Sequence, residues 1–256
     1  VTRPDHAQAL HNRHVALAPA VPVPRSLGVD PALGLVVLQG LGGTLVRHRL
    51  AVPDAALPGP EAVLALLDRL PAPANGARAP GWRAPEWAAL LSRLRPDRAA
   101  ALHALADELT AVAARRDDRL VPVHGDLHEA QLLAQHQRIC GLLDVDTYGL
   151  GHRIDDLATL IGHLATLALT SPRRPSIERY TAGLLAGFDP TVNPVLLRDA
   201  VADVVLGLAT GPFRVLEPAW PANTDARIVL AERWAASARR RAQMRQVSAR
   251  PHGPLT

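Results

Sequence analysis

The spacing of apolar residues changes along the chain and predicts strands near its start and helices over most of the rest. Residues 5–18 carry a helical pattern that a cluster of prolines ends. Two short apolar runs follow, 21–29 and 33–38, and Gly28 and Pro31 supply turn signals between them, which predicts a pair of strands. From about residue 46 the apolar positions take on a helical period. We therefore expect an α+β fold, with a few strands followed by a mostly helical remainder.

Proline and capping residues predict where the later helices begin. Because proline is tolerated in the first turn of a helix, it predicts helices over 60–70, from 85, and over 96–116. A further helical stretch covers 175–188. Side chains that accept backbone N–H bonds predict three more helices: Asp155 and Asp156 for one to about residue 169, Asn193 for one over 194–209, and Asn223 for the last.

The middle of the chain differs, because polar residues gather in the loops between short apolar strands. The strand predicted over 120–123 leads into the polar loop 124–131, with the sequence HGDLHEAQ. Two more apolar segments follow, 132–133 and 139–143, and Asp144 comes directly after the second. Asp126 and Asp144 are carboxylates at neighbouring strand ends, and two such groups can take different roles in one reaction. One can accept the proton of a hydroxyl nucleophile while the other holds Mg²⁺ against phosphate oxygens.

Residues 124–158 resemble the aminoglycoside phosphotransferase family, which shares the protein-kinase-like fold. The family pattern is H-G-D-x-x-x-x-N, then an apolar strand that ends in Asp, then a Gly-containing loop and D-[LI]-A. By this resemblance Asp126 is the catalytic aspartate beside the substrate hydroxyl, and Asp144 is a Mg²⁺ ligand. His124 and Asp156 are supporting residues of the catalytic loop. The resemblance implies an ATP-dependent phosphotransferase that acts on a hydroxyl of a small molecule, with ATP and Mg²⁺ as cofactors.

The chain departs from the family pattern at two points. Gln131 stands where the pattern has its metal-binding Asn, and the extra methylene moves the amide outward by about 1.5 Å. The second departure concerns lysine. All 28 basic residues counted as Lys or Arg are arginines, whereas kinases hold the nucleotide phosphates with a strand lysine under a glycine-rich hairpin.

The resemblance also assigns the start of the chain. Residues 1–43 correspond to part of an N-lobe, with one helix, two strands and the hinge, and residues 44–256 to a helical C-lobe. Gln39, Gly40 and Leu41 would then offer backbone groups to adenine, and we expect the glycine-rich hairpin and the lysine strand to lie before Val1. A rival assignment makes residues 34–50 the phosphate-covering hairpin, with its glycines at the tip.

Composition and charge limit the partners. No apolar run approaches the roughly 18 residues of a membrane span. The net charge is +4, but six arginines follow Glu232, the last acidic residue, so the basicity is a C-terminal feature and nucleic-acid binding is not expected. Cys140 is the single cysteine, which fits a reducing compartment, and we expect a cytoplasmic protein. The expected partners are a nucleotide and a small hydroxyl-bearing substrate.

Two other functions fit parts of the sequence. The absence of lysine and the presence of Gln131 fit a catalytically impaired, kinase-like remnant that acts as a binding module. The motif H-x-D-x-H, formed by His124, Asp126 and His128, fits part of a metal-dependent hydrolase site, although the sequence shows no obvious further ligand.

The remaining polar residues have simpler interpretations. We expect Glu129 to be an exposed loop residue, and His128, His152 and His163 to be surface or core histidines. Five acids of the helical remainder could attract a cationic substrate, although acids on helices usually lie on solvated faces: Glu178, Asp189, Asp203, Glu217 and Asp225.

Overall fold

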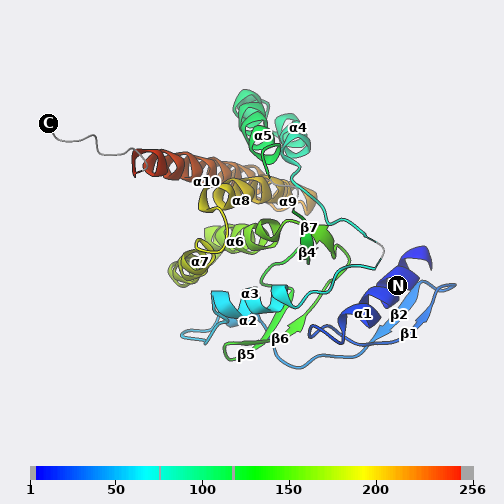
Figure 1. Cartoon of the computed structure of the whole chain (residues 1–256). Helices are drawn as coiled ribbons and strands as arrows, with labels where there is room; N and C mark the ends of the chain where they lie inside the picture. Colours follow the sequence, from blue (N-terminus) through cyan, green and yellow to red (C-terminus); the bar gives the residue numbers. More distant parts are fainter. Residues whose placement is uncertain (1–3, 75, 117–118, 249–256) are drawn as a thin grey trace. The chain divides into compact units, whose positions relative to one another are not determined.

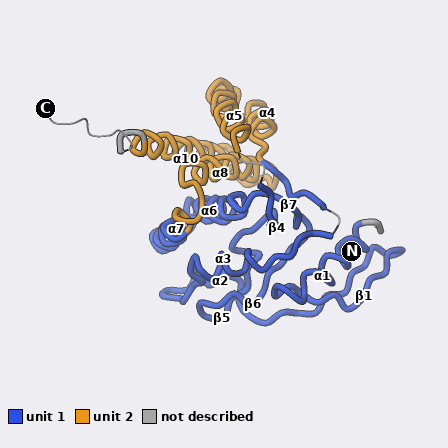
Figure 2. The backbone as a smooth tube through the Cα atoms, in the orientation of Figure 1, with its two compact units in different colours: residues 1–81, 118–187 blue, residues 82–117, 188–256 orange. Residues whose placement is uncertain are grey.

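The computed structural model describes residues 4–74, 76–116 and 119–248, and it divides the chain into two compact units. Unit 1 comprises residues 1–81 and 118–187, and unit 2 comprises residues 82–117 and 188–256 (Figure 2). The elements of both are labelled in Figure 1. The lobe boundary expected after residue 43 stays a prediction.

Unit 1 begins with a helix packed on a two-stranded antiparallel sheet, as the apolar pattern predicts. Helix α1 (Pro4–Leu17) contacts β1 (Ser26–Asp30) and β2 (Leu35–Leu38), which pair with Asp30 opposite Leu35. Two histidines fix the helix to the following segment: the His11 and His14 Nδ1 atoms lie 2.8 Å from Ser26 Oγ and 2.7 Å from Pro24 O. Burial lowers the pKa of His14, so its neutral form is the one that packs here.

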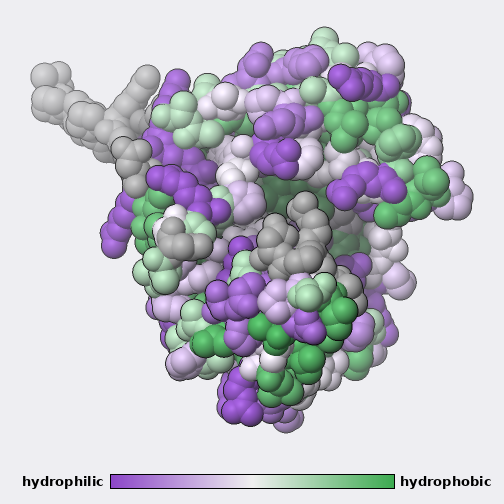
Figure 3. Space-filling view, turned by 90° about the vertical axis from the view of Figure 1, so that its right-hand side faces the viewer, coloured by the Kyte–Doolittle hydropathy of each residue, from purple (hydrophilic) through white to green (hydrophobic). Residues whose placement is uncertain are grey.

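The β1–β2 pair also exposes large apolar side chains. They are Leu27, Leu33, Leu35, Val37 and Leu38, with exposed fractions from 37% to 66%. Figure 3 looks onto the side of the molecule that carries this hairpin, and hydrophobic atoms gather in the lower part of the view. A hairpin with one face on a helix and apolar residues on the other offers a surface for further packing.

Two small sheets form the middle of unit 1. Strands β3 (Thr44–Leu45), β5 (Leu132–Gln135) and β6 (Arg138–Leu142) make one, in the order β3-β5-β6, and all pairs are antiparallel. Strands β4 (Val121–Val123) and β7 (Gly149–Gly151) make the other. The apolar pattern predicts β4, β5 and β6, but β3 and β7 are too short to show a period-two pattern.

The helices of unit 1 are α2 (Val46–Arg49), α3 (Pro60–Asp68), α6 (Arg153–Thr170) and α7 (Arg174–Phe188). The most buried is α6, where Leu157, Leu160 and Ile161 are fully inaccessible to solvent. The predicted cap of α6 is wrong. The helix begins at Arg153 after His152, which makes no side-chain cap, so Asp155 and Asp156 lie inside the first turn.

Unit 2 is helical over its described residues. Its helices are α4 (Ala84–Leu94), the 3₁₀ turn Pro96–Arg98, α5 (Ala99–Ala113), α8 (Pro194–Leu208), α9 (Gly211–Arg214) and α10 (Trp220–Ser248), and α8 packs on α4, α5 and α10. Asn193 caps α8 as predicted, because its Oδ1 accepts the Val195 and Leu196 N–H groups. Asn223 does not cap α10. That helix begins three residues earlier, and the Asn223 amide donates to Glu217 Oε2 instead.

Among the described residues, no helix has both the length and the apolar character that crossing a membrane requires.

Asp199 of α8 gives a test of the packing in unit 2. Burial, followed by the nearby Glu108, raises the pKa of this carboxyl from 3.8 to about 7, while Arg239 opposes the rise. The folded state therefore binds the proton more tightly than the unfolded chain. The stability that this proton adds to the folded state is fully present below about pH 4 and is lost as the pH rises towards 7. We expect the free energy of unfolding to fall by about 2 kcal/mol between about pH 5 and about pH 8.

Urea unfolding of the wild type and of Asp199→Asn across this pH range measures the effect. The variant should lose the decline, because it cannot ionise. Asp107→Asn is the matched control, since Asp107 is exposed on α5. An equal decline in all three proteins would refute the assignment.

Candidate active site

The polar loop 124–131 is held to helix α6 by one buried carboxylate. Asp156 is fully inaccessible to solvent, and its two oxygens accept the backbone N–H groups of His124 and Gly125 at 2.7 and 2.8 Å. A buried carboxylate is stable only when hydrogen bonds compensate its lost hydration, and here the loop backbone supplies them. The aspartate predicted as a helix cap therefore fixes the start of the loop.

His124 braces the same loop from within. Its Nε2 lies 2.8 Å from the Leu143 carbonyl, and its Nδ1 accepts the Asp126 N–H at 3.3 Å. The Thr147 hydroxyl donates to the His124 carbonyl at 3.0 Å. These contacts join the loop to the segment that follows β6, so the two strand ends are held together.

A glycine is required at position 125, because the loop passes close to the segment that follows β6. Its φ is +85°, and a Cβ on this residue would lie 2.5 Å from the Thr147 carbonyl oxygen. A side chain here would force the loop away from the segment after β6.

Asp126 follows this glycine with its side chain 44% exposed. Burial raises the pKa of Asp126 to about 6, and the nearby carboxylates of Asp144, Asp156 and Glu129 add to the rise while His124 opposes it. A carboxylate with this pKa is ionised at neutral pH and is a better proton acceptor than an exposed aspartate. The side chain can therefore serve as a general base.

Gln131 and Asp144 meet beside this base. The Gln131 Nε2 lies 3.2 Å from Asp144 Oδ2, and Asp144 is exposed with a left-handed φ of 53°. The Leu143 N–H also donates to the Gln131 carbonyl at 2.8 Å, which holds the backbones of the two segments together beside these side chains. Amide O and N differ by a half-turn of the side chain, so Gln131 can present its oxygen next to the Asp144 carboxylate. An amide oxygen and a carboxylate are ligands that suit Mg²⁺.

The segment expected to hold adenine lies between β2 and β3. The Gln39 N–H donates to the Arg25 carbonyl at 2.9 Å, Gln39 and Gly40 are exposed, and Leu41 lies against Gly141 of β6. The rival assignment of residues 34–50 as one hairpin is wrong. Strand β2 pairs with β1 and β3 pairs with β5, so the two strands of that hairpin belong to different sheets.

Glu129 is the residue that sequence reasoning places incorrectly. It is fully inaccessible to solvent, and Arg47 Nη1 donates to its Oε1 at 2.9 Å. The Arg47 N–H also donates to the Glu129 carbonyl at 3.1 Å. Burial raises the pKa of Glu129, and Arg47 opposes that rise. Because the partner lies 82 positions earlier in the chain, no local pattern signals the burial.

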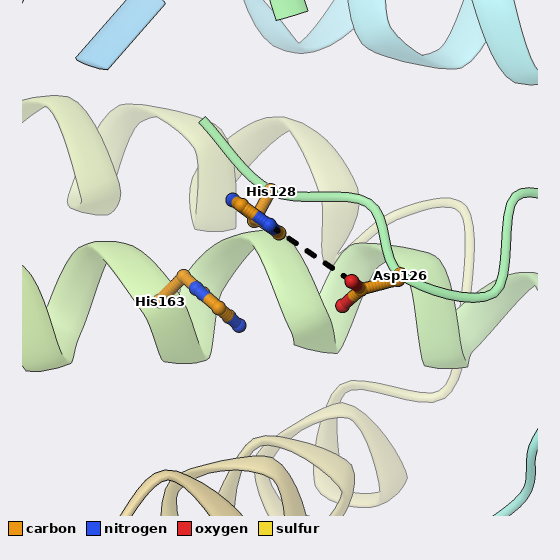
Figure 4. Close-up of side chains that lie close together, drawn as sticks. All are labelled: Asp126, His128 and His163. Atoms are coloured by element: carbon orange, nitrogen blue, oxygen red, sulfur yellow. Dashed lines mark ion pairs between the residues drawn. The ribbon is translucent and has the colours of Figure 1, made fainter. Parts of the chain in front are cut away.

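Asp126, His128 and His163 form a second group of polar side chains, the histidine–aspartate cluster, in which the potential ligand atoms all lie within 4.8 Å of one another (Figure 4). The His128 Nε2 lies 3.9 Å from Asp126 Oδ2, and the His128 and His163 rings stack with centroids 4.2 Å apart. The hydrolase set of His124, Asp126 and His128 is wrong, because the Nε2 of His124 lies at the Leu143 carbonyl and its Nδ1 at the Asp126 N–H. Helix α6 supplies the third member of the cluster instead.

The five acids considered as a cation-attracting set all have protein partners. Glu178 pairs with Arg174, Asp189 with Arg198 and Arg241, Asp203 with the Arg83 N–H, Glu217 with Asn223 and Arg227, and Asp225 with Arg95. Partners within the protein reduce the pull of these acids on an external cation.

Comparison with known proteins identifies the class. The family model described as "Phosphotransferase enzyme family" matches residues 4–191, and the chain belongs to this family. A search of curated proteins gave no match.

Solved structures share the fold at low sequence identity. Aminoglycoside phosphotransferase APH(4)-Ia, in a ternary complex with ADP and hygromycin B, is 14% identical with a TM-score of 0.61, over 88% of this chain and 82% of that one. A choline/ethanolamine kinase family protein from Mesorhizobium loti is 17% identical with a TM-score of 0.58, over 91% and 80%. The APH(2")-IIa complex with gentamicin is 10% identical with a TM-score of 0.59, over 88% and 81%. The predicted α+β, protein-kinase-like fold is thereby confirmed.

Replacement of Asp156 tests the attachment of the loop. Asp156→Ala leaves two backbone N–H groups without acceptors, and we expect it to lower the free energy of unfolding by about 3 kcal/mol. Urea unfolding measures this loss. Asp155→Ala is the matched control and should cost less than about 1 kcal/mol, because Asp155 is only partly buried. Equal losses in the two variants would show that the Asp156 contacts do not hold the loop.

Proposed function

We propose that the protein transfers the γ-phosphoryl group of ATP to a hydroxyl of a small molecule, in a Mg²⁺-dependent reaction. The observation that carries this proposal is the position of Asp126. It stands on a loop braced by Asp156 and His124, next to the Gln131–Asp144 pair. Membership of the phosphotransferase enzyme family supports the reaction class.

Asp126 would orient the acceptor hydroxyl and take its proton as the oxygen attacks phosphorus. Its raised pKa of about 6 lies close to neutral pH, which favours proton transfer while most of the group is still ionised. Phosphoryl transfer depends mainly on positioning and on neutralising charge, so the fixed backbone of the loop matters as much as the base itself.

Gln131 and Asp144 would hold Mg²⁺, which supplies charge neutralisation at the phosphate oxygens when it is bound. The backbone at Gln39, Gly40 and Leu41 would take the adenine, which rests on the family resemblance. The solved relatives support nucleotide binding, since structures of APH(4)-Ia contain ADP or AMP-PNP. A reducing, cytoplasmic location agrees with the single cysteine and stays part of the proposal.

The acceptor is proposed only as a small hydroxyl compound. Relatives with this fold include complexes with hygromycin B and gentamicin as well as a choline/ethanolamine kinase family protein. Because the five helical acids are already paired within the protein, they do not single out a polyamine sugar.

The second candidate function is a binding module without turnover. The exposed apolar face of the β1–β2 pair favours it, because such a face can dock another segment or protein. These 256 residues also contain no lysine to hold the nucleotide phosphates.

Asp126→Asn tests the base. The amide keeps the size of the side chain but cannot accept the proton, so we expect phosphorylation to fall by at least about 100-fold. The assay follows ADP release with a panel of hydroxyl compounds. Asp146→Asn is the matched control, because Asp146 is an exposed aspartate two residues after Asp144 that pairs with His6. Unchanged turnover in Asp126→Asn would overturn the assignment.

The pH dependence tests the same group independently. Only ionised Asp126 can act as a base, so kcat/KM should fall about tenfold for each pH unit below about 6 and level off above it. A profile that stays flat from about pH 5 to about pH 8 would exclude a base with this pKa.

Calorimetry with Mg-ATP tests how well the 256-residue chain holds the nucleotide. Without a phosphate-binding lysine among these residues we expect weak binding, with a Kd well above micromolar. Binding at micromolar affinity would contradict this expectation and would show that arginines and Mg²⁺ suffice.

A further inference from the structure

We propose that Asp126, His128 and His163 form a binding site for a transition-metal ion of the Zn²⁺ type, and that such an ion blocks the catalytic loop when it is bound. Two imidazoles and one carboxylate from two elements of unit 1 lie close together there (Figure 4). The two rings are stacked in parallel, so one of them has to rotate before both nitrogens can face the same ion. The binding site stands on this geometry alone. The blocking effect rests on the proposed function, because it takes Asp126 to be the base.

The register of helix α6 creates the convergence. Asp156, Leu160 and His163 are spaced by four and three residues, so they lie on one face of the helix. Asp156 binds the first residues of the loop, and His163, two turns further on, meets the His128 ring in parallel stacking at 4.2 Å. The contact that docks the loop on α6 therefore also brings the two imidazoles together.

The types of ligand atom indicate which metal ions this site would bind. Imidazole nitrogens with a carboxylate suit Zn²⁺ and its neighbours in the transition series, whereas Mg²⁺ prefers oxygen ligands alone. In a tetrahedral Zn²⁺ site the ligand atoms lie about 3.3 Å apart, and the His128 Nε2 is already 3.9 Å from Asp126 Oδ2. Three protein ligands leave a fourth position for water, which is the arrangement of an open zinc site.

Glu129 places a further carboxylate oxygen near His128. Its Oε2 is buried and makes no hydrogen bond to the described part of the chain, although Oε1 is bound to Arg47. This oxygen lies 3.8 Å from the His128 Nδ1, but Nδ1 accepts the Ala130 N–H at 3.3 Å and therefore has no proton to donate to it. The neutral His128 ring holds its proton on Nε2, and an ion that binds Nε2 has to displace that proton.

Binding of the ion would compete with catalysis for the Asp126 carboxylate. An ion on the Asp126 carboxylate occupies the oxygen that would accept the hydroxyl proton. The Mg²⁺ site predicted at Gln131 and Asp144 uses other ligands, but the Gln131 Nε2 lies 3.2 Å from the His128 Nε2, so an ion bound by His128 has to replace this contact.

Titration of the metal-free chain with Zn²⁺ and with Co²⁺ tests the site without any substrate. We expect one tight site per chain by calorimetry, and a visible absorption spectrum of tetrahedral Co²⁺. His163→Ala and the closer mimic His163→Gln should weaken this site by roughly tenfold or more. His103→Ala is the matched control, because His103 is an exposed histidine on helix α5. Binding that is equal in all four proteins would overturn the proposed site.

Activity assays then separate the site from the proposed function. For each protein, the rate with Zn²⁺ at constant Mg-ATP is divided by its own rate with a chelator. Inhibition that His163→Gln relieves at least about tenfold and His103→Ala does not would support blocking at this site. Inhibition that persists in His163→Gln would mean that Zn²⁺ acts on the nucleotide and would refute blocking. Tight binding in a chain with no turnover under any condition would refute the proposed function and leave the metal site standing.

Discussion

The contact between Asp156 and the start of the catalytic loop is the interaction on which the rest of the site depends. A carboxylate that no solvent reaches is costly to ionise, and the His124 and Gly125 N–H groups are what make its burial tolerable. Because both N–H groups bind the same carboxylate, the start of the loop is fixed against α6. The path of the loop needs the positive φ of Gly125, and it brings Asp126 close enough to Asp144 for the two carboxylates to interact.

The features of the site that the sequence predicts are those that depend on residues close together in the chain. A short apolar strand, a polar loop and a second apolar strand that ends in Asp144 follow one another within about 25 residues, so their order alone indicates which side chains gather at the strand ends. The caps behave in the same way: Asn193 stands directly before Pro194, and both signals agree on where α8 begins.

The features that could not be predicted depend on partners far away in the chain. Glu129 is buried because Arg47 reaches it, and His163 joins the loop because α6 docks there. The family resemblance assigns Asp156 to the support of the catalytic loop, but only the docked loop shows which N–H groups its carboxylate accepts. Asn223 fails as a cap for another reason, because α10 already begins three residues before it, at Trp220. Local propensity is a weak guide wherever such a tertiary contact competes with it.

The ion pair between Arg47 and Glu129 also affects how phosphate charge can be neutralised. Within these 256 residues every strong cation is an arginine, and Arg47, which contacts the catalytic loop, is already committed to a buried carboxylate. Removing Arg47 from that pair would leave Glu129 charged and buried, which costs far more than an exposed pair is worth. In unit 1 its role is therefore to hold the loop to α2. For a phosphotransferase reaction on this loop, the metal at Gln131 and Asp144 would have to carry a larger share of the charge neutralisation than it does in a kinase with a phosphate-binding lysine.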